Sequence, residues 1–248
     1  MLLRVVLAFF LSVWAGALFS QPVKFCYELH AQPPYINDER EVQVGKPGIL
    51  VKRISAVSEE LNIEPLFDRF SWLKCQQLVK QGLADALFVM INTPEREQQF
   101  AFPKESYFIR ANYPLFVNPT GTNSKLLELS RAQVIRELQE NGRYGVGAPL
   151  GYIVHGQLAD LGLLSGFQYS PSKGLSMVAK GKLDAYVLER RIGMTLVQQL
   201  GIQQQVVPTK ASLVEANWHV AFNKDFYRQH PALVERFWAE ISNEQQTP

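Results

Sequence analysis

Cysteine and excess charge are both scarce in this chain of 248 residues. Two cysteines are too few for a scaffold held together by disulfides, and too few for a zinc site built from cysteine alone. The formal net charge of +2 provides no basic surplus that would indicate a nucleic acid or an anionic membrane as partner. A hydrophobic content of 47% argues against a disordered chain, and we expect a globular protein.

Motifs of common hydrolase, metal and nucleotide sites are missing as well. The chain has neither a Gly-x-Ser-x-Gly elbow nor a His-Glu-x-x-His helix. Residues 145–151 faintly resemble a dinucleotide-binding turn, but Pro149 interrupts them and no acidic residue ends the next expected strand. The histidines lie far apart in the sequence, which argues against one metal site; they are His30, His155, His219 and His230. We therefore expect no metal and no cofactor.

The one long apolar run lies near the N-terminus. Arg4 precedes residues 5–14, which are apolar except for Ser12, and small residues follow. This layout is typical of a secretory signal peptide, which we place at residues 1–20, with cleavage after Ala17 and after Ser20 both open. An uncleaved anchor is the alternative, although the run is short for a bilayer span of about 20 residues. We expect an exported, periplasmic monomer without a membrane span in its mature part.

Export changes what the two cysteines indicate. Cys26 lies in an expected strand at residues 23–29, and Cys75 lies in an expected helix at residues 71–81. An even pair of cysteines in an oxidising compartment favours a disulfide. Two buried free thiols are the alternative, since free cysteine often behaves as a small apolar residue.

Strands alternate with helices in the first half of the chain. Apolar residues recur at a spacing of three to four over residues 48–62, which predicts a helix. Short apolar runs predict strands at residues 23–29, 63–67 and 84–91, and Gly82 ends the helix before the last of them. This alternation favours a parallel sheet with helices on both faces.

The second half repeats part of this pattern. Residues 78–86 and 177–185 share a helix end, a glycine stop and an Asp-Ala pair that enters an apolar strand. We expect each aspartate, Asp85 and Asp184, to hydrogen-bond local backbone in its turn. The expected elements of this half are strands at 144–148, 167–170 and 184–188 and helices at 151–161 and 174–179. The repeat indicates two α/β lobes, with a chance match as the alternative.

Residues 81–103 combine Gly-x-x-Asp at 82–85, an apolar strand, Thr-x-Glu-Arg at 93–96 and a phenylalanine-containing stretch at 100–103. This pattern resembles that of periplasmic solute-binding protein family 3, which includes the polar amino-acid receptors of ABC transporters. The second Gly-x-x-Asp, at 181–184, and residues 219–224, which look like the family's last strand, follow in the same order as in the family. The resemblance therefore covers nearly all of the expected mature chain.

The resemblance implies the type II periplasmic binding protein fold, an α/β fold of two lobes with the ligand cleft between them. The second lobe is inserted in the first, so residues 21–112 and 211–248 would form the first lobe and residues 113–210 the second. Two strands would cross between the lobes, near residues 111–115 and 207–211. Open α/β sheets bind ligands beyond the carboxyl ends of their strands, which agrees with such a cleft.

The resemblance also implies site residues. Arg96 matches the family arginine that holds a ligand α-carboxylate, a task that suits a guanidinium because two parallel N–H bonds fit a carboxylate. Trp72 and Tyr35 match positions where the family places an aromatic ring at the ligand. Glu189 lies where amino-acid binders commonly carry an aspartate for the ammonium group.

The sequence departs from the family pattern in both lobes. Asn92 ends a stretch that is one residue shorter than the family's Gly-x-Thr, and Gly151 and Tyr152 begin a stretch that lacks the hydroxyls of the family's Gly-Thr-Thr. The helix after Gly151 would still offer backbone N–H groups to an anion. We place Glu189 on a strand, where the side chain of Arg190 points to the opposite face, and therefore expect an ionised Glu189.

The leading hypothesis is a non-enzymatic periplasmic binder that captures a small polar or carboxylate-bearing, amino-acid-like solute for an ABC permease. An enzyme that resembles cyclohexadienyl dehydratase is one alternative, with Glu189 as proton donor in an apolar cleft. A stand-alone sensor or adaptor that binds a membrane partner is the other alternative.

Overall fold

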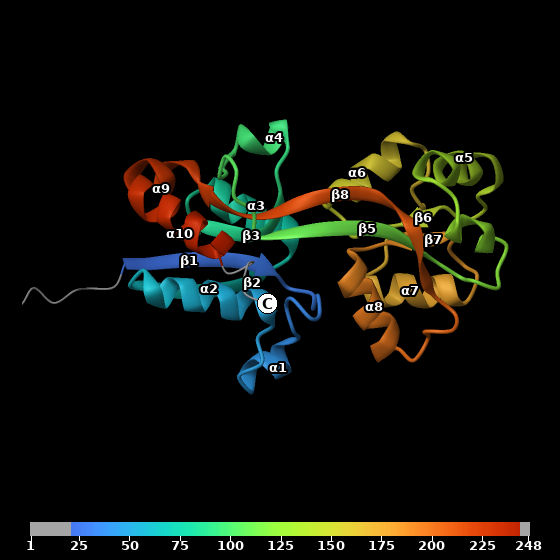
Figure 1. The fold of residues 1–248 in the computed structure, drawn as a ribbon, viewed down its shortest axis with the longest axis horizontal. Coiled ribbons are helices and arrows are strands. Elements are labelled where there is room, and N and C mark those ends of the chain that lie inside the picture. The colour runs from blue at the N-terminus through green and yellow to red at the C-terminus, as the bar shows by residue number, and fades with distance from the viewer. Residues whose placement is uncertain (1–20, 244–248) are drawn as a thin grey trace, which may run out of the picture.

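The computed structural model describes residues 21–243, so the expected signal peptide at 1–20 lies outside the described residues. Strands and helices alternate along the chain (Figure 1). The strands are β1 (Gln21–Glu28), β2 (Ile63–Phe70), β3 (Ala86–Ile91), β4 (Phe100–Ala101), β5 (Ile109–Val117), β6 (Val146–Gly147), β7 (Ala185–Val187) and β8 (Val207–Asn223). The helices are α1 (Glu39–Gln43), α2 (Ile49–Glu60), α3 (Trp72–Lys80), α4 (Pro94–Glu97), the 3₁₀ helix η1 (Ser124–Leu127), α5 (Arg131–Asn141), α6 (Ile153–Asp160), α7 (Pro171–Ala179), α8 (Arg190–Gln199), α9 (Lys224–Gln229) and α10 (Pro231–Asn243).

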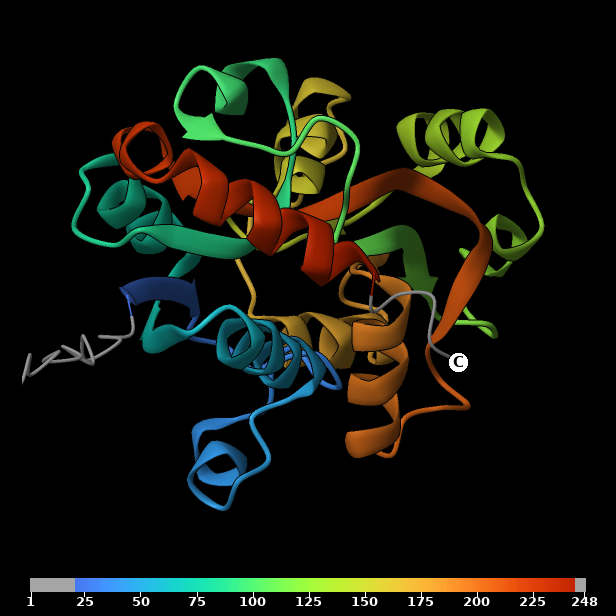
Figure 2. The same ribbon diagram turned by 60° about the vertical axis from the view of Figure 1, so that its left-hand side comes forward.

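The strands form one open, mixed sheet that runs through two lobes (Figures 1 and 2). Their order is β2-β1-β3-β8-β5-β7-β6, with β4 beside β8. The long strands β5 and β8 pass between the lobes and pair antiparallel over nearly the whole length of β5. Helices α2, α3, α9 and α10 surround the strands of the first lobe, and α5 to α8 surround β6 and β7 (Figure 1).

Each lobe is built on the same arrangement of strands. In the first lobe β1 pairs parallel with β2 and β3, and β3 pairs antiparallel with β8. In the second lobe β6 pairs parallel with β7 and with a bridge at Leu164, and β7 pairs antiparallel with β5. Gly82 and Gly181 follow α3 and α7 with φ of 72° and 64°, the left-handed conformation that ends a helix. The repeated sequence pattern therefore corresponds to a repeated α/β unit.

The two repeated aspartates hold the strand beside their own. Asp85 Oδ2 accepts a hydrogen bond from the N–H of Lys24 in β1 at 2.8 Å. Asp184 Oδ2 accepts from three consecutive backbone N–H groups, at residues 143–145 just before β6, over 2.7 to 2.8 Å. The expectation of a bond within the local turn is wrong: Asp85 bonds to β1 itself, and Asp184 bonds to the residues just before β6.

Three expectations about the sheet need correction. Residues 167–170 form no strand, and in this region only Leu164 makes a bridge to β6. Phe167 is 71% exposed, so this segment does not pack on the sheet. The sheet is mixed rather than parallel, because β5 and β8 run antiparallel to their neighbours. The expected crossing at 207–211 and the expected strand at 219–224 belong mostly to one strand, β8, of 17 residues.

The disulfide between Cys26 and Cys75 is present and joins β1 to α3. Both cysteines are fully buried, with their Cα atoms 5.4 Å apart. The prediction of a bridge is thus confirmed against the alternative of two free thiols. The bridge also fixes the start of α3, where Trp72 lies, against the carboxyl end of β1.

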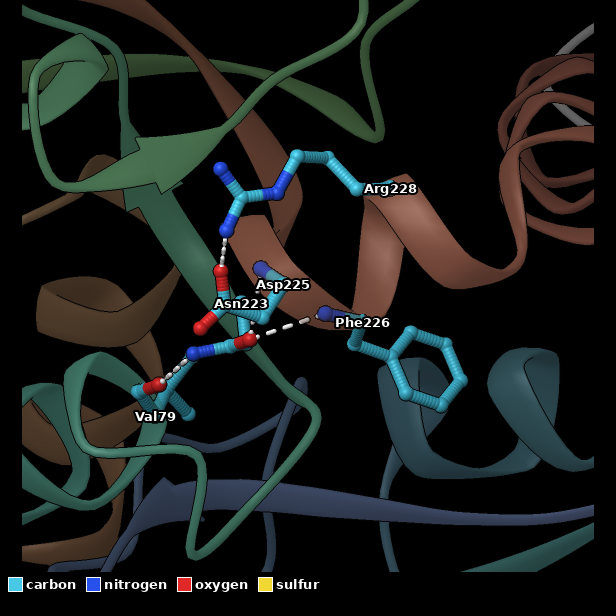
Figure 3. Close-up of polar contacts among 5 residues, drawn as sticks. All are labelled: Val79, Asn223, Asp225, Phe226 and Arg228. Carbon is cyan, nitrogen blue, oxygen red and sulfur yellow. Dashed lines mark hydrogen bonds and ion pairs between the residues drawn. The ribbon is translucent and has the colours of Figure 1, made fainter.

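The end of β8 connects the C-terminal helices to the first lobe (Figure 3). Asn223 donates from Nδ2 to the Val79 carbonyl of α3 at 2.7 Å. Its Oδ1 accepts from the N–H groups of Asp225 and Phe226, both at 2.9 Å. One side chain therefore caps α9 and holds it to α3.

We propose that the lobes divide as the resemblance implies, with residues 21–112 and 211–248 in the first lobe and residues 113–210 in the second. The paths of β5 and β8 support these boundaries, because both strands pass from one group of helices to the other (Figure 1). None of the helices within residues 21–243 combines the length and the apolar character that crossing a bilayer requires.

Candidate ligand-binding site

A pocket lies where the carboxyl ends of the first-lobe strands face the second lobe. We call it the Arg96 pocket, and its lining residues are Glu28, Gln32, Trp72, Val89, Ile91, Arg96, Tyr113, Tyr152, Ile153 and Val154. They come from β1, α3, β3, α4, the crossing strand β5 and the start of α6. The volume is only about 20 Å³, enough for roughly one water. The lobes are thus in contact with each other here.

Arg96 reaches this pocket from α4, which Thr93 caps. Thr93 Oγ1 accepts a hydrogen bond from the Arg96 N–H at 3.3 Å, so the Thr-x-Glu-Arg pattern builds a short capped helix. Arg96 Nη1 donates to the Ile91 carbonyl at 2.9 Å, and Nη2 donates to the Gly151 carbonyl of the second lobe at 3.4 Å. Burial lowers the pKa of Arg96, which shows that its guanidinium is poorly solvated and would gain from a bound anion.

Three contacts between the lobes close the pocket beside this arginine. The rings of Trp72 and Tyr152 meet edge to face, with their centroids 6.2 Å apart. Gln32 Nε2 donates to the Tyr152 hydroxyl. Gly151 has a φ of +79°, and a Cβ at this position would lie 2.7 Å from Leu73 Cδ2, so no larger residue fits there without displacement. The structure thus brings Trp72, Gly151 and Tyr152 together with Arg96.

Glu28, the last residue of β1, lines the pocket and was missed by the sequence analysis. It is 6% exposed, and burial raises the pKa of its carboxyl against the opposing effect of nearby backbone N–H groups. One of these, the N–H of His30, donates to Oε1 at 3.1 Å. A buried acid therefore lies in the same pocket as the partly buried Arg96. Its position could have identified it from the sequence, because Glu28 is an acidic residue at the carboxyl end of an expected parallel strand, where ligands of such sheets bind.

Gln32 and Tyr113 add polar groups that sequence patterns did not single out either. Gln32 Oε1 is buried and has no hydrogen-bond partner among residues 21–243. An unpaired buried acceptor costs roughly 1–3 kcal/mol, so an N–H donor on a ligand would be favoured beside it. The Tyr113 hydroxyl accepts from Trp218 Nε1 at 2.6 Å, and its own proton can be donated. Gln32 follows β1 and Tyr113 lies on β5, so only the fold relates them to Arg96.

A bulge in β3 shapes one wall of the pocket. The register with β8 shifts between Phe88 and Met90, and Val89 between them has a φ of +72°. A β-branched residue in the left-handed region is strained, and such strain concentrates at functional sites. Val89 lines the Arg96 pocket. No glycine or asparagine marks the bulge, so the sequence could not indicate it.

Glu189 lies in a different cavity from Arg96, so the structure does not bring these two residues into one pocket. The expectation that Glu189 is on a strand is wrong, because β7 ends at Val187 and Glu189 is the N-cap of α8. Its Oε2 accepts from the N–H groups of Arg191 and Ile192 at 2.9 and 3.0 Å. Burial raises its pKa to about 7 despite these bonds, so it is partly protonated at neutral pH rather than fully ionised.

Tyr35 and Asn92 also lie outside the Arg96 pocket. Tyr35 is buried beside the cavity that contains Glu189, and its ring meets the Trp218 ring edge to face at 5.1 Å. Asn92 Nδ2 donates to Glu97 Oε1 at 2.6 Å on the exposed side of α4. Neither residue is thus placed to contact a ligand beside Arg96 in this closed arrangement.

No metal site accompanies the pocket. Among residues 21–243, no group of three or more histidine, cysteine, aspartate or glutamate side chains is arranged to hold a metal ion. The buried His219 has its Nδ1 3.2 Å from the Ser106 carbonyl oxygen, as a hydrogen-bonded core histidine would.

We expect Glu189 to make the protein less stable as the pH rises from about 5 to about 8. Its pKa is about 7 in the folded state against an ordinary 4.5, so between these values the folded state keeps a proton that the unfolded state has lost. The free energy of unfolding therefore falls through this window, by on the order of 3 kcal/mol. Glu189→Gln keeps the size and the capping oxygen and should flatten this dependence. Urea unfolding of both proteins at the two pH values measures it, and equal losses in both would contradict the assignment.

Comparisons with known proteins agree on the fold. No family model matches the chain, and no curated protein matches its sequence. A solved histidine kinase sensor domain with similarity to periplasmic binding proteins is 20% identical, covers 92% of both chains and has a TM-score of 0.73. Holo ArgBP from T. maritima is 14% identical over 92% of both chains, with a TM-score of 0.69. AbpA, an amino acid ABC transporter substrate-binding protein from Streptococcus pneumoniae bound to L-arginine, is 19% identical, covers 91% of this chain and 89% of its own, and has a TM-score of 0.68.

These matches extend over nearly the whole described chain. Their sequence identities are low, so the matches show a shared fold and no more. They agree with the two lobes, the two crossing strands and the repeated α/β unit seen in the structure. The fold expected from the resemblance to family 3 is thereby confirmed: this chain has the two-lobed α/β fold of the periplasmic solute-binding proteins.

Proposed function

We propose that this protein is a periplasmic binder of a small amino-acid-like or other carboxylate-bearing solute, which it holds between its two lobes. The observation that carries the proposal is the presence of a partly buried cation, Arg96, and a buried acid, Glu28, in one pocket between the lobes. A guanidinium holds a carboxylate through two parallel N–H bonds, and a carboxylate is the natural partner of an ammonium group. A zwitterion would satisfy both groups at once.

Binding would replace contacts between the lobes with contacts to the ligand. Arg96 now donates to the Gly151 carbonyl, and Gln32 donates to the Tyr152 hydroxyl. When the lobes part, these donors become available, and the ligand carboxylate takes the place of the Gly151 carbonyl at Arg96. The lobes then close again with the ligand between them, covered by the rings of Trp72 and Tyr152.

An adjoining recess indicates the size of the ligand. It has a volume of about 320 Å³, shares Glu28, Trp72 and Tyr152 with the Arg96 pocket, and continues between Leu73 and Leu150. These two leucines are 46% and 55% exposed although they flank a recess between the lobes. A hollow of this size lies within the usual range for small-molecule sites. The proposed ligand therefore extends from Arg96 past Glu28 with an apolar portion beside the leucines.

A thermal-shift screen with amino acids and organic acids tests this proposal, because a ligand that binds only the folded state raises its unfolding temperature. No stabilisation by any carboxylate-bearing compound would contradict it. With the strongest amino-acid hit, we expect Glu28→Gln to weaken binding about 10- to 100-fold, since the charge facing the ammonium group is lost. Affinity for the same ligand without its amino group should change little, and calorimetry measures both.

Glu189→Gln is the matched control, since it removes a buried carboxylate outside the Arg96 pocket. We expect it to leave both affinities nearly unchanged. The reverse result, a selective loss of the amino acid in Glu189→Gln and none in Glu28→Gln, would assign the ammonium group to Glu189, as the family resemblance implies, and refute the role of Glu28.

We propose further that the closed, ligand-bound form delivers its ligand to an ABC permease. The second candidate role is sensing of the same ligand through a membrane partner, which the similarity to a histidine kinase sensor domain favours. Uptake of radiolabelled ligand by cells that lack the protein distinguishes the two roles. Lost uptake supports transport, and unchanged uptake supports sensing.

An enzyme on the same fold is favoured only by the pKa of about 7 at Glu189. An acid with this pKa is partly protonated at neutral pH and can donate a proton. Its carboxyl, however, lies outside the Arg96 pocket and caps α8. Turnover of prephenate or arogenate by the purified protein, abolished in Glu189→Gln, would overturn the binding role.

A further inference from the structure

A second cavity between the lobes lies beside the crossing strand β5. We call it the arginine cavity and define it by Arg53, Arg110, Asn112, Glu189, Arg190 and Arg191. It has a volume of about 320 Å³, and its walls come from α2 of the first lobe, from β5 and from the start of α8 in the second lobe. A molecule bound there would thus contact both lobes.

The arginine cavity and the Arg96 pocket take different residues of β5. Arg110 and Asn112 alternate along this strand with Tyr113, and neighbouring side chains on a strand point to opposite faces. Tyr113 lines the Arg96 pocket, whereas Arg110 and Asn112 line the arginine cavity. The two sites have no lining residue in common. They can therefore be tested separately.

Positive charge is in excess in the arginine cavity. The guanidinium groups of Arg110, Arg190 and Arg191 line it together with a single carboxylate, that of Glu189, which already accepts two backbone N–H bonds. The ion pairs found within residues 21–243 are formed by other side chains and include none of Arg110, Arg190 and Arg191. Like charges that converge on one cavity repel each other, so an anion held among them would be favoured.

Existing contacts orient these side chains without occupying all of their donors. Arg190 Nη2 donates to the Thr209 carbonyl of β8 at 3.0 Å, which is one of five N–H groups on that guanidinium. The guanidinium carbon of Arg110 lies 5.8 Å from the centre of the Tyr107 ring. The Asn112 side chain has no hydrogen-bond partner among residues 21–243, so its amide adds a further donor. Planar guanidinium forks are well matched to oxyanions that accept two bonds each.

We propose that the arginine cavity binds a small multivalent oxyanion, a di- or tricarboxylate or a phosphate, which joins the two lobes from the α8 side of β5. Arg110 would hold the anion from β5, and Arg190 and Arg191 would hold it from α8. The anion stabilises the closed arrangement of the lobes. This site acts in addition to the ligand of the Arg96 pocket and does not depend on it.

Calorimetric titration of the purified protein with sodium citrate and with sodium phosphate, near pH 7.5, tests this inference. Sodium chloride at matched ionic strength corrects for general screening. We expect saturable binding to one site for at least one of the two anions, and the stronger of them identifies a polycarboxylate or a phosphate as the natural class. Arg110→Gln should weaken that binding at least tenfold. Arg40→Gln, at an exposed position of α1, should change it less than twofold.

The unfolding temperature of each variant without added anion shows whether the variant is folded. If Arg110→Gln does not fold, Arg191→Gln, from the other lobe, takes its place in the test. The inference is overturned if neither anion shows saturable binding. It is also overturned if Arg40→Gln weakens anion binding as much as the cavity variants do. Binding that is lost in Arg96→Ala and retained in Arg110→Gln would place the anion in the Arg96 pocket. That result would refute the arginine cavity as a site and leave the proposed function intact.

Discussion

Arg96→Ala is expected to weaken ligand binding by about 2–5 kcal/mol, the range for truncating one partner of a buried, hydrogen-bonded charge pair. The ligand carboxylate would remain in a poorly solvated pocket without the guanidinium that holds it. Calorimetry with the strongest compound from the ligand screen measures the loss, which corresponds to a factor of about 30 or more in affinity. Unchanged affinity would show that Arg96 only connects the lobes, through its bond to the Gly151 carbonyl, and would refute the carboxylate proposal.

Two further variants separate charge from geometry at this position. Arg96→Lys keeps a positive charge but cannot offer two parallel N–H bonds, so we expect an intermediate loss of affinity. Arg228→Ala removes an exposed arginine that pairs with Asp225 on α9, outside both cavities, and should leave binding unchanged. If Arg96→Lys binds as well as wild type, a point charge is sufficient and the two-bond geometry at the carboxylate is wrong.

Replacing Cys26 and Cys75 together by alanine is expected to lower the free energy of unfolding by about 4 kcal/mol. The disulfide joins residues 49 apart in sequence, and closing a loop of that length removes much conformational entropy from the unfolded chain. The bridge also holds the end of β1, with Glu28, to the start of α3, with Trp72, so ligand affinity should fall as well. Urea unfolding at one pH measures the change in stability.

A reductant provides the control for the disulfide prediction. It should lower the stability of wild type toward that of the double variant and have no effect on the variant itself. A loss of stability below about 1 kcal/mol would contradict the prediction, and would indicate that the unfolded chain is already restricted between these residues.

Elements whose signal is local could be predicted from the sequence. The spacing of Leu50, Ile54 and Val57 marks the buried face of α2, and the glycine stops mark the ends of α3 and α7. Helix α8 was missed, because Glu189 and Arg190 were placed on the preceding strand, and because Gly193 lowers the helix propensity of this segment. In the folded protein a Cβ at Gly193 would lie 2.0 Å from the Phe116 ring, so glycine is needed for α8 to pack on β5. A contact between residues so distant in sequence leaves no local pattern.

The sequence by itself determined the α/β class, the alternation of strands and helices in the first half of the chain, the disulfide pair and Arg96 as the candidate for a carboxylate. Each of these depends on residue type, local spacing or a short motif. Only the tertiary structure decided which side chains share a pocket. It placed Glu28 and Gln32 from the end of β1 beside Arg96, and it put Glu189 in another cavity as the cap of α8. The physical reason is that the pockets form where two lobes and β5 meet, so their composition depends on the crossing of strands and on one bulge rather than on any local pattern.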